Sequence, residues 1–368
     1  MRFLADAQRK YRLAFDKLAC RNASSVWDWI RPLTPAEAWN SGIWRSLDGE
    51  LRRFFRSPRI REAFGSYAMY LGGSPYRLPG LFSILAYGEL AQGLWLPRGG
   101  IHALARAIES LAAGLGVRIL TGHRVRRILV ADSAVTGAEL EDGRLFESPV
   151  IVSNVDAPST ERRLLGRTGG AARAVRMTPS VMTLYWGMRR KPAGASHHTI
   201  FLPRDARRNY DSLIGRGRIP EELPFYMSIA TETDPSLAPE GHSAIFLLVP
   251  LPLLSDLESW NMDELAGHLK SRILERLARH GIALERENLL VERTLSPADW
   301  AERFGLHDGS AFGAAHTLFQ MGPFRFPNRD PAVRGLYYAG ASTTPGTGLP
   351  MVALGGEMTA ERILHDLP

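Results

Sequence analysis

The spacing of apolar residues changes along the chain, and these changes predict where helices and strands lie. Residues 1–61 place apolar side chains three and four positions apart, which predicts helices and no strand. The same spacing predicts a helix at 101–115. Short β-branched runs then predict strands at 117–120, 125–130, 135–140, 144–146 and 150–153, with Asp142-Gly143 as a hairpin turn between two of them.

The middle of the chain alternates strand-like runs with polar, arginine-bearing loops. The runs predict a sheet with one apolar face, built from 181–188, 198–202, 225–229 and 244–249. A long amphipathic helix is predicted at 262–280, with Gly281 as its C-terminal stop. Ser296 and Pro297 predict the cap and first residue of another helix.

The end of the chain carries the most informative local pattern. A short buried strand at 335–340 runs into a glycine-rich stretch at 341–350, and a helix is predicted at 351–367. A strand, glycine turn and helix N-terminus together present backbone N–H groups to an anion or a polarised carbonyl oxygen. An ordinary tight loop before a helix is the alternative interpretation.

Composition narrows the class of protein. The 368 residues are 45% hydrophobic and 23% charged, which fits a soluble globular chain of about two domains. A single cysteine, Cys20, excludes an intramolecular disulfide. The net charge is +7, but four of the 45 basic side chains are lysine and the other 41 are arginines dispersed along the chain. This dispersal indicates a coding bias rather than a nucleic-acid surface.

Two segments predict contact with a membrane surface. The apolar stretch 78–97 contains Pro79 and several glycines, so it is a poor spanning helix but could dip into a bilayer surface. Tryptophans at 27, 29, 39 and 44 precede an arginine- and phenylalanine-rich cluster at 52–61. Such a mixture suits either a bilayer interface or a solvated helix face that packs on its other side. We expect a cytoplasmic, peripherally membrane-associated protein.

Several motifs in a fixed order resemble those of the bacterial phytoene desaturases along essentially the whole chain. They are Trp95-x-Pro97-Arg98-Gly99-Gly100, His197-His198-Thr199, Thr233-Asp234-Pro235-Ser236, Ala311-Phe312-Gly313, Phe324-Arg325 with Pro327-Asn328-Arg329, and the terminal glycine-rich turn. The resemblance implies an FAD-dependent oxidoreductase of the flavin amine-oxidase-like superfamily. It also implies a hydrophobic polyene as the substrate, with hydride transfer to flavin as the reaction.

The resemblance implies an α/β (α+β) fold, in which an incomplete Rossmann-like FAD domain is interleaved with a substrate domain of mixed sheet plus helices. Residues 1–98 would form a helical, membrane-facing part of the substrate domain, and 157–295 its sheet and helix. Residues 99–156 and 296–368 would belong to the FAD domain.

Specific residues follow from the same resemblance. The residues implied to contact FAD are Gly99, Gly100, Val125, Gly340, Ala341, Gly346, Gly348, Leu349, Pro350 and Met351. Trp95, Phe312 and Phe324 flank shared motifs and are candidates for a substrate channel, although each could be plain core. No catalytic side chain is assigned. Adjacent histidines 197 and 198 are expected to point in different directions, and no metal site is expected.

One family feature is missing from this sequence. The resemblance implies a strand, a G-x-G-x-x-G turn and a helix for the FAD pyrophosphate, and no segment has that pattern. Residues 1–31 instead resemble an internal helical part of the family, so we expect weak FAD retention by these 368 residues. A carotenoid isomerase of the same superfamily and a non-catalytic binder of membranes or hydrophobic ligands remain as alternatives.

Overall fold

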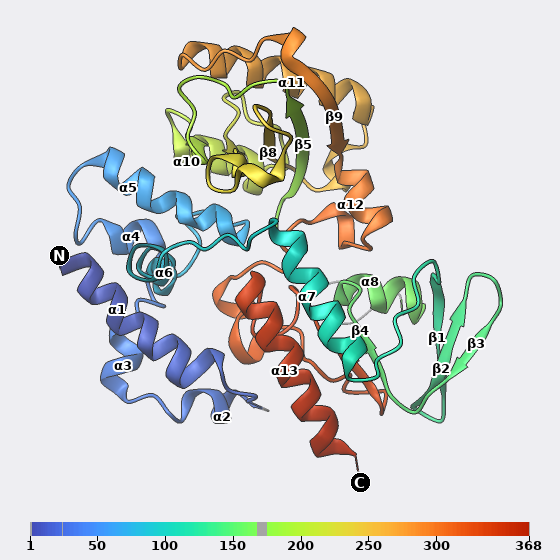
Figure 1. Ribbon diagram of the computed structural model, residues 1–368. Coiled ribbons are helices and arrows are strands. Elements are labelled where there is room, and N and C mark those ends of the chain that lie inside the picture. Colours follow the sequence, from blue (N-terminus) through green and yellow to red (C-terminus); the bar gives the residue numbers. More distant parts are fainter. Residues whose placement is uncertain (1, 24, 168–174, 368) are drawn as a thin grey trace. The chain divides into compact units, whose positions relative to one another are not determined.

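The computed structural model describes residues 2–23, 25–167 and 175–367 (Figure 1). The chain forms two compact units, each built from separate stretches of sequence. Unit 1 contains Met1–Gly93, His123–Pro179 and Ala301–Pro368, and unit 2 contains Leu94–Gly122 and Ser180–Trp300.

The N-terminal part of unit 1 is helical. Its elements are α1 (Arg2–Ala14), η1 (Phe15–Ala19), α2 (Val26–Ile30), α3 (Pro35–Asn40), α4 (Leu47–Leu51), α5 (Pro58–Gly65), η2 (Ser66–Leu71), η3 (Gly80–Ser83) and α6 (Ile84–Gln92). Between 2 and 61, the described residues contain no named strand, so the helical prediction is confirmed. A buried Lys10–Glu50 ion pair of 2.7 Å joins α1 to α4 beside a cluster of phenylalanine rings. None of the described helices is long and apolar enough to cross a membrane.

Two small sheets complete unit 1. Strands β1 (Val125–Ala131), β2 (Ala134–Leu140) and β3 (Leu145–Glu147) form an antiparallel meander, and Gly143 turns the chain between β2 and β3 as predicted. Strands β4 (Ile151–Ser153) and β10 (Leu336–Tyr338) pair in parallel. The remaining helical elements of unit 1 are α8 (Ala157–Ser159), η4 (Thr160–Leu164), η10 (His307–Gly309), η11 (Leu318–Gln320), η12 (Gly322–Phe324) and α13 (Leu349–Asp366).

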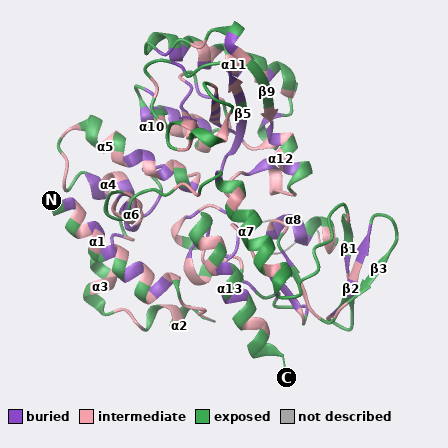
Figure 2. Ribbon diagram, viewed as in Figure 1, coloured by how far each residue is buried: buried purple, intermediate pink, exposed green. Residues whose placement is uncertain are grey.

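The prediction of a strand at 117–120 is wrong. These residues form an extended loop after α7 (Ile101–Gly114), and no described strand pairs with them. The N–H of Val117 donates to the carbonyl of Ala112, so the first residue of the run is part of the turn that ends α7. A β-branched run becomes a strand only where a neighbouring strand accepts its hydrogen bonds. Helix α7 itself has no buried residue (Figure 2).

Unit 2 is organised around a five-stranded antiparallel sheet in the order β6-β7-β8-β5-β9. The strands are β5 (Ser180–Met188), β6 (His198–Phe201), β7 (Phe225–Ser228), β8 (Ser243–Leu251) and β9 (Leu289–Leu295). Four were predicted. The fifth, β9, was missed because it is an edge strand with mostly exposed side chains, so its sequence lacks the alternation of a half-buried strand.

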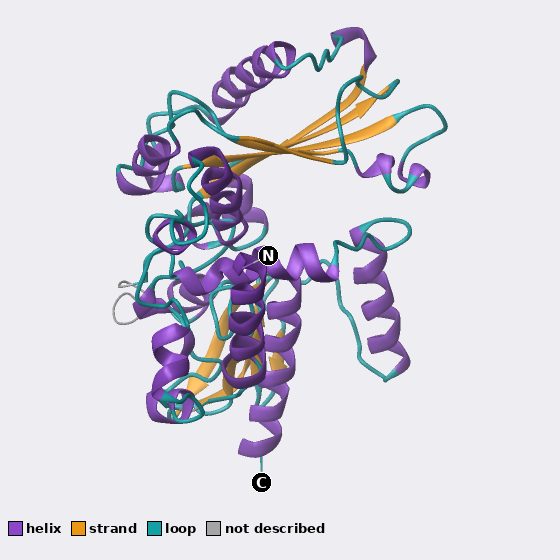
Figure 3. Ribbon diagram, turned by 90° about the vertical axis from the view of Figure 1, so that its left-hand side faces the viewer, coloured by secondary structure: helices purple, strands orange, loops and turns teal. Residues whose placement is uncertain are grey.

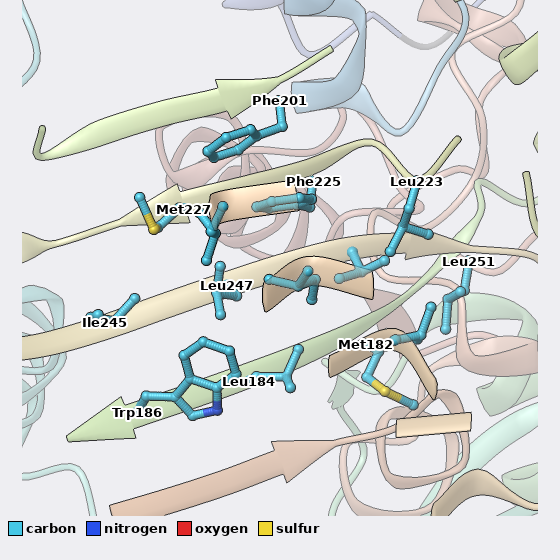
Figure 4. Close-up of a cluster of buried hydrophobic side chains, with 14 of the residues drawn as sticks. Met182, Leu184, Trp186, Phe201, Leu223, Phe225, Met227, Ile245, Leu247 and Leu251 are labelled. Atoms are coloured by element: carbon cyan, nitrogen blue, oxygen red, sulfur yellow. The ribbon is translucent and has the colours of Figure 1, made fainter. Parts of the chain in front are cut away.

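One face of this sheet supplies the largest core of the protein. Leu184, Met227 and Leu247 lie on adjacent strands and are fully buried (Figure 4). Helix α11 (Met262–Arg279) covers this face, as Figure 3 shows, and buries leucine and isoleucine side chains four residues apart. Gly281, with φ of 74°, follows its C-terminus. The predicted apolar face, helix and stop are therefore confirmed.

Apart from α11 and α7, the helical elements of unit 2 are short. They are α10 (Ala206–Tyr210), η5 (Asp211–Gly215), η6 (Ala230–Glu232), η7 (Pro235–Leu237), η8 (Leu254–Leu257) and η9 (Arg286–Asn288). Helix α12 (Pro297–Arg303) contains the sequence boundary between Trp300 of unit 2 and Ala301 of unit 1. Ser296 accepts a hydrogen bond from the N–H of Asp299, which confirms its predicted capping role.

The sheet core gives a first prediction. Leu247→Ala should lower the free energy of unfolding by about 2–5 kcal/mol, because it removes buried methyl groups from the central strand. Leu290→Ala, on the exposed edge strand, is the matched control and should change it by less than about 0.5 kcal/mol. Urea unfolding measures both, and equal losses in the two variants would contradict this assignment of the core.

Candidate functional site

The candidate site lies in unit 1, where β10 leads through a glycine-rich loop into α13. All three residues of β10 are buried, and the N–H of Ala339 donates to the carbonyl of Ser153 at 3.1 Å. The loop then runs from Gly340 to Gly348, and α13 begins at Leu349. The predicted strand, turn and helix are confirmed, with the helix starting two residues earlier than expected.

The loop needs glycine at specific positions. Gly346 has φ of 147°, and a Cβ atom there would stand 2.6 Å from Nε2 of His316. Gly348, with φ of 106°, is the residue before α13. Only glycine adopts such backbone angles without strain. The spacing of these glycines therefore reflects both the shape of the loop and its closeness to a buried ring.

The first turn of α13 leaves backbone donors without partners inside the helix. The N–H of Val352 donates to the carbonyl of Gly348, so the helical ladder starts there. The N–H groups of Leu349 and Met351 lie before that point and have no intrahelical acceptor, while Pro350 has no N–H. Because Leu349 and Pro350 are exposed, this positive helix end is open to a ligand oxygen.

A buried guanidinium supports the loop. Arg325 is 4% exposed and donates to four carbonyl oxygens. They belong to Thr343 at 2.8 Å, Ala314 at 3.0 Å, Gln320 at 3.1 Å, and Ala341. Burial lowers the pKa of Arg325 to about 10. The side chain thus joins the loop at 341–343 to the segment at 314–320.

A buried imidazole lies against the same loop. His316 is 5% exposed, and its Nε2 accepts a hydrogen bond from the N–H of Thr347 at 3.5 Å. Burial, and then the charge of Arg325, lower the pKa of His316 well below its ordinary value, so the ring is neutral. An imidazole that accepts at Nε2 carries its proton on Nδ1. Among the described residues, Nδ1 has no hydrogen-bond partner.

A carboxylate holds the start of the loop. Asp156 accepts a hydrogen bond from the hydroxyl of Ser342, and a second from the N–H of His307 at 3.1 Å. The Ser342 oxygen in turn accepts from the N–H of Ala314 at 3.0 Å. Burial raises the pKa of Asp156, while these donors lower it. Asp156 therefore positions the loop through these hydrogen bonds.

Polar side chains also fix β10 and α13. The amide of Asn328 donates to the carbonyl of Thr344 at 3.0 Å and to the hydroxyl of Thr359 on α13 at 3.2 Å. The hydroxyl of Tyr338 lies 2.5 Å from Glu161 and 2.6 Å from Asp330, and Arg167 bridges these two carboxylates. Strand, loop and helix are thus bound to one buried polar network.

The remaining candidates from the sequence lie elsewhere. Val125 is the first residue of β1 in unit 1. Gly99 and Gly100 belong to unit 2, where the N–H of Gly99 donates to Asp234 at 2.8 Å. Phe312 is partly buried in unit 1, and Phe324 is half-exposed there. Trp95 is 87% exposed in unit 2. Their roles at a cofactor or in a channel stay predictions.

The expectation that His197 and His198 point in different directions is wrong. Their rings stack with centroids 3.9 Å apart. The alternation of a strand does not apply to the pair, because β6 begins at His198 and His197 lies in the preceding loop. Each ring has its own hydrogen-bond partner, Thr233 for His197 and Tyr226 for His198. Across the described residues, no group of three or more potential ligands could hold a metal ion.

The sequence reasoning missed the residues that support the loop. Arg325 and Asn328 were noted only as parts of shared motifs, and His316 and Asp156 were given no role. The available signal was an arginine among apolar neighbours in Met321–Phe326, which indicates a buried cation. Nothing local showed which carbonyl groups this cation binds.

The family model of flavin containing amine oxidoreductases matches residues 34–364. The chain therefore belongs to the flavin containing amine oxidoreductase family, and it is an oxidoreductase.

Curated relatives agree with this assignment. The zeta-carotene-forming phytoene desaturase of Myxococcus xanthus is 36% identical over 98% of this chain and 70% of its own length. The lycopene-forming phytoene desaturase of Pseudescherichia vulneris is 30% identical over 100% of this chain and 75% of its own length. The resemblance to bacterial phytoene desaturases is thereby confirmed.

Solved structures support the fold. An oxidoreductase from Methanosarcina mazei matches 90% of this chain and 71% of its own, with a TM-score of 0.62 and 18% identity. A redesigned putrescine oxidase matches 98% of this chain and 75% of its own, with a TM-score of 0.58 and 15% identity. The predicted α/β (α+β) fold is confirmed as a mixture of helices and sheets.

The residues present fit one end of a flavin cofactor. The open N–H groups of Leu349 and Met351 at the positive end of α13 suit a ring carbonyl oxygen, and the glycines permit close approach. Ala341 has no side-chain oxygen, so it offers the ribityl chain no side-chain hydrogen bond. The described residues include no G-x-G-x-x-G turn for a pyrophosphate.

Gly346 tests how tightly the loop is packed. Gly346→Ala should lower the free energy of unfolding by about 1–3 kcal/mol, because its Cβ would meet the His316 ring and its φ disfavours alanine. Gly356→Ala in α13 is the matched control, since its Cβ would meet nothing within 4 Å. That control should stabilise the helix by up to about 1 kcal/mol. Equal stability of the two variants in urea would refute the close contact.

The neutral state of His316 predicts a pH dependence. The unfolded chain binds a proton at His316 near pH 6.5, and the folded chain does so only at much lower pH. Stability should therefore fall as the pH drops below about 6.5, by up to about 1.4 kcal/mol per pH unit from this group. His316→Gln should remove that part of the slope, measured by urea unfolding between pH 7.5 and 5. The exposed His102→Gln variant is the control, and an unchanged slope in His316→Gln would contradict the prediction.

Proposed function

We propose that this chain carries out FAD-dependent desaturation of a carotenoid precursor, phytoene or a related polyene. The observation that carries the proposal is the open α13 N-terminus on its buried support, in a chain whose curated relatives include phytoene desaturases. The substrate class comes from these relatives. The geometry of the loop supports the cofactor class.

Flavin in the form of FAD is the proposed cofactor, and the residues proposed to hold it are those that the family resemblance implies. In unit 1 they are Val125, Gly340, Ala341, Gly346, Gly348, Leu349, Pro350 and Met351. In unit 2 they are Gly99 and Gly100. When bound, the flavin supplies a two-electron acceptor. The donors of Leu349 and Met351 favour negative charge at the bound ring as it is reduced.

The proposed reaction needs orientation more than acid or base catalysis. A hydride leaves one allylic carbon, a proton leaves the adjacent carbon, and the two carbons form a new double bond. Conjugation along the polyene spreads the developing positive charge, so the protein's part is to align an apolar chain and exclude water. Trp95, Phe312 and Phe324 are the proposed aromatic residues of that apolar path.

Peripheral attachment to a membrane is part of the proposal, because polyene substrates dissolve in bilayers. Trp27, Trp39 and Trp44 are more than 60% exposed in unit 1, which favours a bilayer interface over a packed helix face for these rings. Phe54 and Phe55 instead pack against the Phe3 ring. Trp29 lies close to Gly322. The exposed tryptophans are thus the stronger candidates for lipid contact.

The test is product analysis with phytoene in lipid vesicles, FAD and a quinone as electron acceptor. Because the 368 residues contain no G-x-G-x-x-G turn, a second arm adds the part of the Myxococcus relative that lies outside its match to this chain. Flavin absorbance of the purified protein identifies which arm is loaded with cofactor. We expect a coloured product that has lost two hydrogen atoms per step.

The other outcomes would overturn the proposal. A product of unchanged mass and altered geometry would assign the chain as an isomerase. If phytoene stayed unchanged in the flavin-loaded arm, the chain would be a non-catalytic binder of hydrophobic ligands. Leu349→Asp is the matched site variant, because a carboxylate beside the open N–H groups should repel a negatively charged reduced ring and slow the reaction.

A further inference from the structure

Unit 2 contains a cleft of about 960 Å³ whose lining is unusually rich in arginine. It lies between the segment that carries α10 and η5 and one side of α11. Eight of its eighteen lining residues are arginines, whereas 41 of 368 residues are arginine in the chain as a whole. Five lining residues are acidic. Arginines that are dispersed along the sequence are therefore brought together by the fold, and positive side chains outnumber negative ones around this cleft.

Two of these arginines form the inner wall and are already used by the fold. Arg276 on α11 is 7% exposed and donates to the carbonyl groups of Leu223 and Leu202. Arg272, one turn earlier, donates to the carbonyl groups of Pro220 at 3.1 Å and Glu221. They tie the loop that borders the cleft to α11, so this wall is preformed.

Three other arginines of the lining have side chains that no described residue binds. Among the described residues, the side chains of Arg204, Arg216 and Arg218 form no hydrogen bond or ion pair. Gly217, between the last two, has φ of 61°, and a Cβ there would lie 2.5 Å from the carboxylate of Asp256. This tight turn fixes the backbone from which Arg216 and Arg218 extend.

Four carboxylates of the lining interact with groups other than the side chains of these three arginines. Asp205 caps α10 by accepting from the N–H of Arg208 at 2.9 Å, and Glu222 accepts from the N–H of Arg204 at 2.6 Å. Glu221 and Glu275 face Arg208 and Arg279 at 3.4 and 3.5 Å. Arginine side chains without partners in a cleft raise the local concentration of anions.

We propose that this arginine cleft, defined by Arg204, Arg216, Arg218, Arg272 and Arg276, binds a phosphate group. Guanidinium groups bind phosphate through paired N–H donors, and several of them on a preformed wall suit an anion with more than one charge. A free phosphate compound and the headgroup of an anionic lipid share this chemistry. The site uses residues of unit 2 alone and is independent of the proposed desaturation.

The experiment measures the binding of inorganic pyrophosphate by isothermal titration calorimetry. The double variant Arg216→Gln with Arg218→Gln should bind about tenfold more weakly, because two unpaired donor groups are lost. Arg189→Gln with Arg190→Gln is the matched control, since both residues are exposed in unit 2, lie outside the cleft lining and change the net charge equally. Thermal unfolding checks that both variants remain folded.

A second arm separates the two sources of phosphate. Vesicles of phosphatidylcholine, with or without phosphatidylglycerol, are sedimented with the wild type and both double variants. Loss of binding to the anionic vesicles in the cleft variant alone supports a lipid headgroup, and pyrophosphate binding without vesicle binding supports a free phosphate compound.

Three results would overturn the proposal. Equal weakening in both double variants would show that only net charge matters. If the cleft variant bound pyrophosphate and anionic vesicles as tightly as the wild type does, Arg216 and Arg218 would not be part of a phosphate site. A single-stranded oligonucleotide that binds the cleft more tightly than pyrophosphate would replace a phosphate group with a nucleic acid as its ligand.

Discussion

The candidate site depends on a single buried cation. Arg325 donates to carbonyl oxygens of four residues from two segments, 314–320 and 341–343. Buried carbonyl groups without donors cost free energy, and a buried guanidinium without acceptors costs more. Each group therefore needs the others in place. The glycine-rich loop takes its conformation from this mutual requirement, and α13 begins where that loop ends.

The same cation determines the chemistry of its surroundings. Its charge, added to burial, keeps His316 neutral, so the ring accepts from the N–H of Thr347. The charge of Asp156 acts against burial and raises the pKa of Arg325, and Asp156 also holds Ser342 at the start of the loop. The buried guanidinium thus binds the backbone of the loop, helps to keep the His316 ring neutral and interacts electrostatically with Asp156. The N–H groups of Leu349 and Met351 are the part of this assembly that has no acceptor inside α13.

Arginine side chains have two opposite roles in this chain. Arg325 and Arg276 are buried and donate to backbone carbonyl groups, so they are part of the framework. Arg204, Arg216 and Arg218 have no partner among the described residues and line a cleft. The amino-acid composition does not distinguish these arginines. Their burial and their partners depend on residues far away in the sequence. The fold alone separates structural arginines from those available to a ligand.

Local patterns in the sequence determined the elements whose cause is local. The glycines around 340–348, the hairpin at Asp142-Gly143 and the stop at Gly281 follow from backbone angles that few residues adopt. Segment 117–120 and strand β9 were misjudged, because strand formation depends on a partner that is distant in sequence. The roles of Arg325, His316 and Asp156 were decided only by tertiary structure. Their hydrogen bonds join segments that come together when the chain folds, and their pKa values depend on burial, which arises only in the folded chain.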